Sequence, residues 1–305
     1  MYNTSAVEVK GPNHEMSETI TQQTVKTASE RHWRAPVLYS IAYLLFWQIA
    51  PRFHDDRIGA VILATIVSLV LVVLITASAA RSMKTTWAAL LTALITAAIV
   101  LPLRVQFAAG VIVAPWIWIL FVPGLADLTF VLFGAAFGVL LSRLLRSANM
   151  VPPAAAALAL VDIWTVLLGG PVQKVMTSTS ASAQRVAQAM TVQLPAPTSG
   201  AAPIAVVGFA DFVFMAFFVA AMCRFLGDAI GYGRTIGPMA AVLALYMVVV
   251  LLTGWSLPAL LPMALVVIAV HWRRFHYERS ELFALLYAGL LLLALMAGSV
   301  WLTRR

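Results

Sequence analysis

The sequence predicts an all-α fold, a polytopic bundle of about nine or ten transmembrane helices. Hydrophobic residues make up 62% of the 305 residues and charged residues only 10%, whereas a soluble domain carries far more charge. Most of the chain divides into apolar runs near the roughly 20 residues that a helix needs to cross a bilayer. The run 61–80 shows no alternation of apolar and polar residues, so it does not resemble a strand of a membrane β-barrel.

Ten apolar runs are the candidate spans, separated by charged or helix-breaking residues. In order they cover 36–50, 58–80, 86–102, 107–122, 128–145, 152–168, 202–225, 236–253, 257–270 and 282–302. A polar loop at 169–201, rich in Ser, Thr, Ala and Pro, separates the sixth from the seventh. The fifth contains Gly134 and Gly138, a GxxxG spacing that is typical of a helix-packing face.

The chain divides into four parts by composition. Residues 1–34 form a polar tail without the apolar segment of a signal peptide, and we expect this tail to be disordered. Membrane helices occupy 35–151 and, with the polar loop, 152–271. A further loop and an additional helix occupy 272–305.

The net charge of +8 comes from basic residues that lie mostly between the apolar runs. This pattern is typical of membrane-protein loops, so we expect a lipid bilayer rather than nucleic acid as the partner. When the 20 basic residues are assigned to alternating sides of ten spans, they divide equally, and the count predicts no orientation. The single cysteine, Cys223, excludes an internal disulfide and a thiolate cluster.

Two aspartates, Asp162 and Asp211, are the acidic residues embedded in predicted spans. A charged carboxylate at the bilayer centre costs roughly 2.5–3.5 kcal/mol, and such residues usually serve a function. The two spans are consecutive and antiparallel. With a rise of 1.5 Å per residue, both carboxylates should lie roughly 9–14 Å below the same membrane surface and face each other.

A facing pair of carboxylates has a specific chemistry. Two such groups in contact share one proton, so one can act as a general base on water while the other polarises a carbonyl oxygen. The alternatives are a proton or cation relay in a transporter, or a structural role in which each aspartate caps a helix or pairs with an arginine. The sequence contains no HExxH motif and His271 and His276 lie outside the spans, so we expect no metal and no cofactor.

Three segments resemble the presenilin and signal peptide peptidase family of intramembrane aspartyl proteases. LVDIWTVLLGGPVQKV, which holds Asp162 and the pair Gly170-Pro171, is similar to the first catalytic segment. GFADFVF, which holds Asp211, is similar to the GxGD segment, and LPALLP, at 257–262, is similar to the Pro-Ala-Leu motif. The segments occur in the order of the family's sixth, seventh and ninth helices, with a polar loop between the aspartates.

The resemblance implies a presenilin-like fold in a prokaryotic membrane and hydrolysis of peptide bonds within transmembrane segments or remnant signal peptides. Asp162 and Asp211 would be catalytic. The substrate, itself a transmembrane helix, would contact five residues, namely Gly208, Ala210, Pro258, Ala259 and Leu260. The backbone near the Pro-Ala-Leu motif would pair with the unwound substrate strand, and a second copy of the chain is a possible partner.

The sequence departs from the family pattern in three places. The tyrosine that precedes the first catalytic aspartate is replaced by Val161, which removes a hydroxyl group near the pair. The second glycine of GxGD is replaced by Ala210, which adds a methyl group. The predicted tenth span extends beyond the ninth helix, near which the family usually ends.

Overall fold

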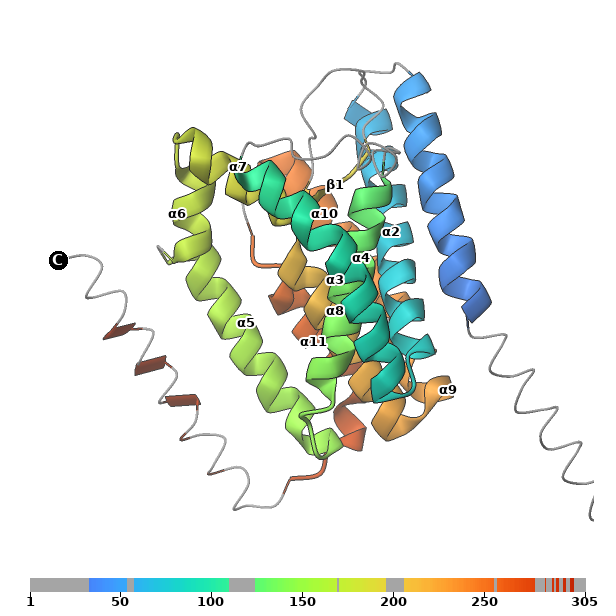
Figure 1. Ribbon diagram of the computed structural model, residues 1–305. Coiled ribbons are helices and arrows are strands. Elements are labelled where there is room, and N and C mark those ends of the chain that lie inside the picture. The colour runs from blue at the N-terminus through green and yellow to red at the C-terminus, as the bar shows by residue number, and fades with distance from the viewer. Residues whose placement is uncertain are drawn as a thin grey trace, which may run out of the picture.

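The long helices of the chain run roughly side by side in a computed structural model (Figure 1). The structure describes residues 33–53, 58–109, 124–168, 170–195, 206–254 and 257–277, with isolated residues or pairs of residues between 283 and 298. These residues are predominantly helical, which confirms the all-α class. Within these ranges, six helices are long and apolar enough to cross a membrane, so the chain is an integral membrane protein. They span Gly59–Ser82, Thr86–Val105, Leu125–Ser142, Ala148–Val175, Phe209–Leu226 and Asp228–Thr253.

A helix at residues 33–49 comes first and is followed, within the described ranges, by fifteen elements, most of which are labelled in Figure 1. These are η1 (Ala50–Phe53), α2 (Ile58–Ser82), α3 (Thr86–Ala109), α4 (Leu125–Ser142), η3 (Ala148–Met150), α5 (Val151–Leu167), α6 (Pro171–Thr177), α7 (Ala181–Ala189), β1 (Thr191–Gln193), β2 (Val206–Gly208), α8 (Phe209–Leu226), α9 (Asp228–Gly231), α10 (Ile236–Thr253), α11 (Leu260–His271) and η4 (Trp272–Arg274). Most predicted spans match a helix. The predicted spans at 107–122 and 282–302 lie largely outside the described residues.

The seventh predicted span is shorter than expected at its N-terminal end. Residues 206–208 form strand β2, and α8 begins only at Phe209. Asp211 is therefore in the first turn of its helix rather than about nine residues inside it, which corrects the predicted depth of this carboxylate. Hydropathy missed the change because β-branched and small apolar residues suit a short strand as well as a helix.

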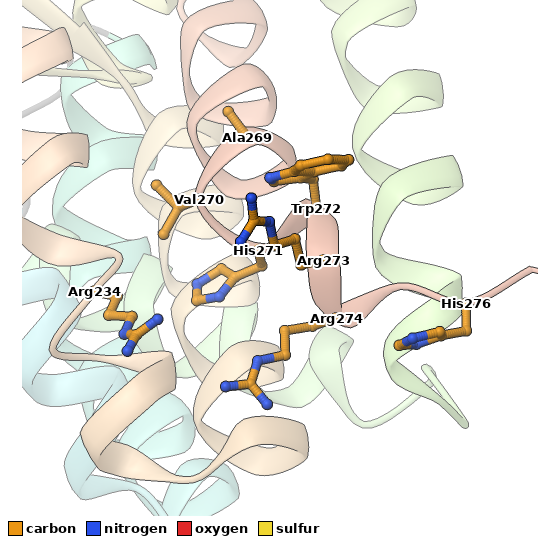
Figure 2. A pocket seen from close by; sticks show the side chains of 8 residues that line it. All are labelled: Arg234, Ala269, Val270, His271, Trp272, Arg273, Arg274 and His276. Atoms are coloured by element: carbon orange, nitrogen blue, oxygen red, sulfur yellow. The ribbon is translucent and has the colours of Figure 1, made fainter.

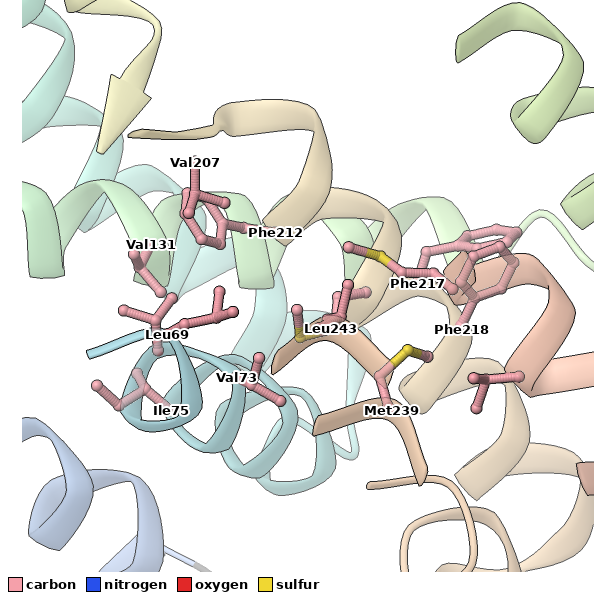
Figure 3. Packing of buried hydrophobic residues seen from close by; sticks show 14 of the residues in the cluster. Leu69, Val73, Ile75, Val131, Val207, Phe212, Phe217, Phe218, Met239 and Leu243 are labelled. Carbon is pink, nitrogen blue, oxygen red and sulfur yellow. The ribbon is translucent and has the colours of Figure 1, made fainter. Parts of the chain in front are cut away.

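Helix α8 is at the centre of the bundle and packs closely on α4. A Cβ atom added at Gly138 would lie 2.0 Å from the Val213 carbonyl oxygen, and one at Gly134 would lie 3.2 Å from Phe212 Cβ. Both glycines are needed for this approach, which confirms the predicted packing face. Figure 3 shows side chains of α2, α4, α8 and α10 meeting in this core, among them Leu69, Val131, Phe212 and Leu243.

Helix α5 lies at the periphery and packs on α11, which in turn contacts α8 (Figure 1). In the apolar segment that contains α5, only 17% of the residues are buried inside the protein, against 56% in the segment that forms α8. Most residues of α5 therefore lie outside the core that the described residues form. Helix α11, whose first residue Leu260 belongs to the Pro-Ala-Leu motif, thus contacts both aspartate-bearing helices.

The bundle has a loop end, with α6, α7, β1 and β2, and an opposite end, with α9 (Figure 1). The equal division of basic residues predicted from ten alternating spans is wrong, because Arg143, assigned to one side, donates to the Lys84 carbonyl oxygen of the other at 2.6 Å. Asp228, beside Arg224 in sequence, also pairs with Arg81 at 3.3 Å.

The described basic residues gather at the α9 end. The helix at 33–49 places Trp47 beside Gly124 at the loop end, so Arg34 lies at the α9 end. The α9 end carries nine of these residues, namely Arg34, Arg81, Lys84, Arg143, Arg146, Arg224, Arg234, Arg273 and Arg274. The loop end carries four, namely Arg52, Arg104, Lys174 and Arg185. For the part of the chain that the structure describes, the positive-inside rule therefore favours the α9 end as the cytoplasmic side.

Candidate functional site

Asp162 lies in the last turns of α5 and contacts the start of α11. Its Oδ2 atom accepts a hydrogen bond from the backbone N–H of Leu260, at 2.8 Å. The first N–H groups of a helix have no partner within that helix and carry partial positive charge, so a carboxylate is a strong acceptor for them. Asp162 thereby fixes the Pro-Ala-Leu segment against α5.

Asp211 is the third residue of α8 and turns back toward the strand before it. Its Oδ2 atom accepts from the backbone N–H of Gly208 at 3.1 Å, the reciprocal bond of a capping box. The φ of Gly208 is −72° and its ψ is 151°, extended values that place the strand and the helix in direct succession. The sequence Gly-Phe-Ala-Asp thus folds so that the aspartate stabilises its own helix start.

The two carboxylates and the hydroxyl of Tyr246 are close enough to interact electrostatically with one another. Among the described residues, the second carboxylate oxygen of each aspartate makes no hydrogen bond, and neither of these oxygens is an enclosed, unpaired atom. Each aspartate therefore uses one oxygen to hold the backbone and has the other available for a proton or a water molecule.

Tyr246 is a site residue that the sequence analysis missed. Its hydroxyl donates to the carbonyl oxygen of Leu257, directly before the Pro-Ala-Leu motif. The sequence does contain a sign of this role, because Tyr246 is the one tyrosine in the apolar run that forms α10. A tyrosine hydroxyl inside a membrane span needs a hydrogen-bond partner. Val161 stands before Asp162 and carries no hydroxyl group. Tyr246 supplies a hydroxyl near the two aspartates from a different helix, α10.

The five predicted substrate-contacting residues differ in their exposure. Ala210 is exposed, Gly208 and Ala259 are half-buried, and Pro258 and Leu260 are buried. The Leu260 N–H is bonded to Asp162 and the Leu257 carbonyl is bonded to Tyr246. While these bonds persist, neither backbone group can pair with a substrate strand. Fewer backbone groups of the Pro-Ala-Leu segment are therefore available to a substrate than the sequence predicted.

Strands β1 and β2 form an antiparallel pair directly before α8, with Thr191 opposite Gly208 and Gln193 opposite Val206. The outer edge of β1 is occupied: Arg104 Nη1 donates to the Thr191 carbonyl at 2.9 Å, and the Gln193 N–H donates to the Asp127 carboxylate. The opposite edge belongs to β2, where Val206 is exposed.

Arg104 and Asp127 themselves form an ion pair, with Nη2 and Oδ1 2.6 Å apart and 15% of each side chain exposed. The Arg104 guanidinium also lies 4.3 Å from the ring centroid of Phe130, which stacks on Phe209 at the start of α8. Both residues lie between predicted spans, where hydropathy assigns them no role. Together they connect α3 and α4 to the strand and to the first turn of the helix that bears Asp211.

The described residues contain no group of three or more His, Cys, Asp or Glu side chains that could hold a metal ion. The chain matches no protein-family model, no curated protein and no solved structure.

Proposed function

We propose that the chain is an intramembrane aspartic endopeptidase with a presenilin-like arrangement of helices, which cleaves transmembrane segments of other proteins. Asp162 and Asp211 would be its catalytic pair. One observation carries the proposal: carboxylates from two separate helices interact electrostatically, and one of them, Asp162, is held by the Leu260 N–H at the start of α11, at 2.8 Å. Each carboxylate retains an oxygen that no described residue occupies.

The proposed reaction requires one protonated and one ionised carboxylate. The ionised member removes a proton from water as the water oxygen attacks the scissile carbonyl carbon, and the protonated member donates its proton to the carbonyl oxygen. The tetrahedral intermediate then collapses, the C–N bond breaks, and the leaving nitrogen takes up a proton from the pair. As the new carboxyl group forms, one hydroxyl of the intermediate returns its proton to the pair, so one water is consumed and the pair again holds a single shared proton.

The sheet before α8 offers a way to hold the unwound substrate. A helical substrate must expose its backbone before water can attack, and an exposed strand edge can pair with that backbone. Because Arg104 and Asp127 occupy the edge of β1, the edge of β2 at Val206 is the side on which a third strand would add. Such a strand would run beside Gly208, three residues before Asp211.

Asparagine substitutions test the pair because they separate catalysis from helix capping. An Asn side-chain oxygen at position 162 or 211 can still accept from Leu260 or Gly208, but an amide cannot act as the general base. We expect Asp162→Asn and Asp211→Asn each to abolish cleavage of a reporter transmembrane helix in proteoliposomes. Their free energies of unfolding should change far less than that of Asp162→Ala, which loses the cap at a cost of about 0.5–2 kcal/mol.

Asp228→Asn is the matched control, since it removes a carboxylate at the α9 end, where Asp228 pairs with Arg81 and Lys84. This variant should cleave the reporter as the wild type does. Full activity of Asp162→Asn or Asp211→Asn would overturn the proposal. A different result would favour a proton relay in place of a protease. In that case the wild type would not cleave the reporter but would carry a proton flux, and both Asn variants would abolish that flux.

A further inference from the structure

A second site lies at the α9 end, opposite the candidate protease site. A cavity of about 430 Å³ opens between the α9–α10 connection and the end of α11. Figure 2 shows its side chains, of which Arg234 comes from the α9–α10 connection and the others from the end of α11 and the residues after it. The lining residues are Arg234, Ala269, Val270, His271, Trp272, Arg273, Arg274 and His276.

The lining carries three arginines and no carboxylate. No hydrogen bond or ion pair joins the guanidinium groups of Arg234, Arg273 and Arg274 to a described residue. Asp228, the acidic residue described at this end, is engaged by Arg81 and Lys84. Glu278 and Glu281 follow in the sequence and lie outside the described residues. The lining therefore carries an excess of positive charge that a bound anion would balance.

The walls of the cavity are held in place by hydrogen bonds. His271 is buried, with 1% of its surface exposed, and its Nε2 atom is 2.8 Å from the hydroxyl of Thr235, the residue after Arg234. The segment that follows η4 is anchored to Asn149, which bonds both the N–H and the carbonyl of His276. Arg234 and the residues around Arg274 are thereby fixed relative to each other before any ligand arrives.

The position of the cavity suits a ligand at the membrane surface. Trp272 is 64% exposed at the end of α11, and the guanidinium of Arg273 lies 5.4 Å from its ring centroid. Exposed tryptophans are enriched where a membrane meets water, at the depth of lipid headgroups. The α9 end is also the end that the positive-inside rule favours as cytoplasmic, and the cytoplasmic leaflet carries anionic lipid.

We propose that this cavity binds a phosphate group carried by an anionic molecule, with Arg234 and Arg274 as its principal ligands. Arginine pairs with phosphate through two parallel N–H bonds, and basic pockets between transmembrane helices are typical sites for anionic headgroups. The phosphate belongs either to a lipid headgroup or to a soluble phosphate ester. The site is independent of the proposed protease chemistry.

Native mass spectrometry of the full chain in detergent can measure this binding. The probes are phosphatidylglycerol, phosphatidylcholine with the same acyl chains, and inorganic phosphate. We expect phosphatidylglycerol to bind about tenfold more tightly than phosphatidylcholine, and Arg234→Gln and Arg274→Gln each to weaken that binding by about tenfold. Arg234→Lys, which keeps the charge but not the paired donors, should fall between these values.

Arg146→Gln is the control, because Arg146 is exposed at the same end and does not line the cavity. It removes the same charge and should change the affinity by less than about twofold. An equal loss in Arg146→Gln would overturn the proposal. Equal binding of both lipids by the wild type would exclude a lipid headgroup, and if inorganic phosphate also failed to bind, the proposal as a whole would be overturned. Displacement of phosphatidylglycerol by millimolar inorganic phosphate would assign the site to a soluble phosphate, and persistence of the lipid would assign it to the headgroup.

A second measurement does not depend on how the arginine variants fold. Phosphatidylglycerol with brominated acyl chains should quench the fluorescence of the wild type more strongly than that of Trp272→Phe. The extra quenching should be absent with brominated phosphatidylcholine. Identical quenching of the wild type and the variant by brominated phosphatidylglycerol would also overturn binding of a lipid headgroup at this cavity.

Discussion

Removing the guanidinium of Arg104 should destabilise the strand that precedes the candidate site. Arg104 donates to Asp127 at 2.6 Å and to the carbonyls of Thr191 and Gln188 at 2.9 and 3.2 Å, and 15% of its side chain is exposed. In Arg104→Met the Asp127 carboxylate stays in place with its cationic partner removed. Breaking a buried pair in this way costs about 3–5 kcal/mol, which we expect as the loss in the free energy of unfolding.

The double variant Arg104→Met/Asp127→Leu should lose less than the single variant. No unpaired charge is left behind, so the main cost is the Thr191 carbonyl and the Gln193 N–H that lose their partners, at about 1 kcal/mol each. The expected total is about 2 kcal/mol. A double variant more stable than Arg104→Met would show that the cost of the single change is mostly the stranded carboxylate.

Reversible unfolding in mixed micelles measures the stability, and hydrogen exchange reports on the strand. The Gln193 amide should exchange faster in Arg104→Met, whereas amides in the middle of α8 should change only with global stability. Arg185→Gln, on exposed α7, is the control and should change the stability by less than about 0.5 kcal/mol. If Arg104→Met destabilises no more than Arg185→Gln, the proposed connection between this ion pair and the site is wrong.

Three further changes test the packing and the site. Gly138→Ala should cost about 1–3 kcal/mol of unfolding free energy because its Cβ meets the Val213 carbonyl, whereas Gly59→Ala, whose Cβ meets nothing within 4 Å, should cost none. Tyr246→Phe should cost about 1 kcal/mol and slow reporter cleavage, since the Pro-Ala-Leu segment loses a donor; unchanged cleavage would remove Tyr246 from the site. Gly208→Ala, whose Cβ would lie 3.4 Å from Asp211 Oδ2, should leave the melting temperature unchanged but lower cleavage if a substrate strand passes there.

Hydropathy predicted the helices of the central bundle because their sequences are long and uniformly apolar. The runs at 58–80 and 236–253 agree with α2 and α10 within two residues at each end. The GxxxG spacing also predicted a real contact, since Gly134 and Gly138 face α8. These features are local, and a single stretch of sequence contains all the information that specifies them.

The sides of the membrane could not be predicted in the same way. Side assignment depends on the parity of the span count, so one extra crossing reverses every later loop. The contact between Arg143 and the Lys84 carbonyl reveals the error, because the two residues had been assigned to opposite surfaces. Contacts between distant segments, such as Tyr246 with Leu257 or Arg104 with Thr191, carry no signature in the sequence.

The structural contacts of the two aspartates do not by themselves explain why these residues are aspartates. Asp162 and Asp211 each accept one backbone N–H at a helix start, a task that Ser, Thr or Asn performs nearly as well. A carboxylate adds an insertion cost that reaches roughly 2.5–3.5 kcal/mol toward the centre of the bilayer, and the chain carries that charge at two neighbouring positions. Neutral caps would avoid both this cost and the repulsion between the two groups. The property that an asparagine lacks is the ability to gain and release a proton, so a comparison of aspartate with asparagine at both positions decides between a cap and a catalytic pair.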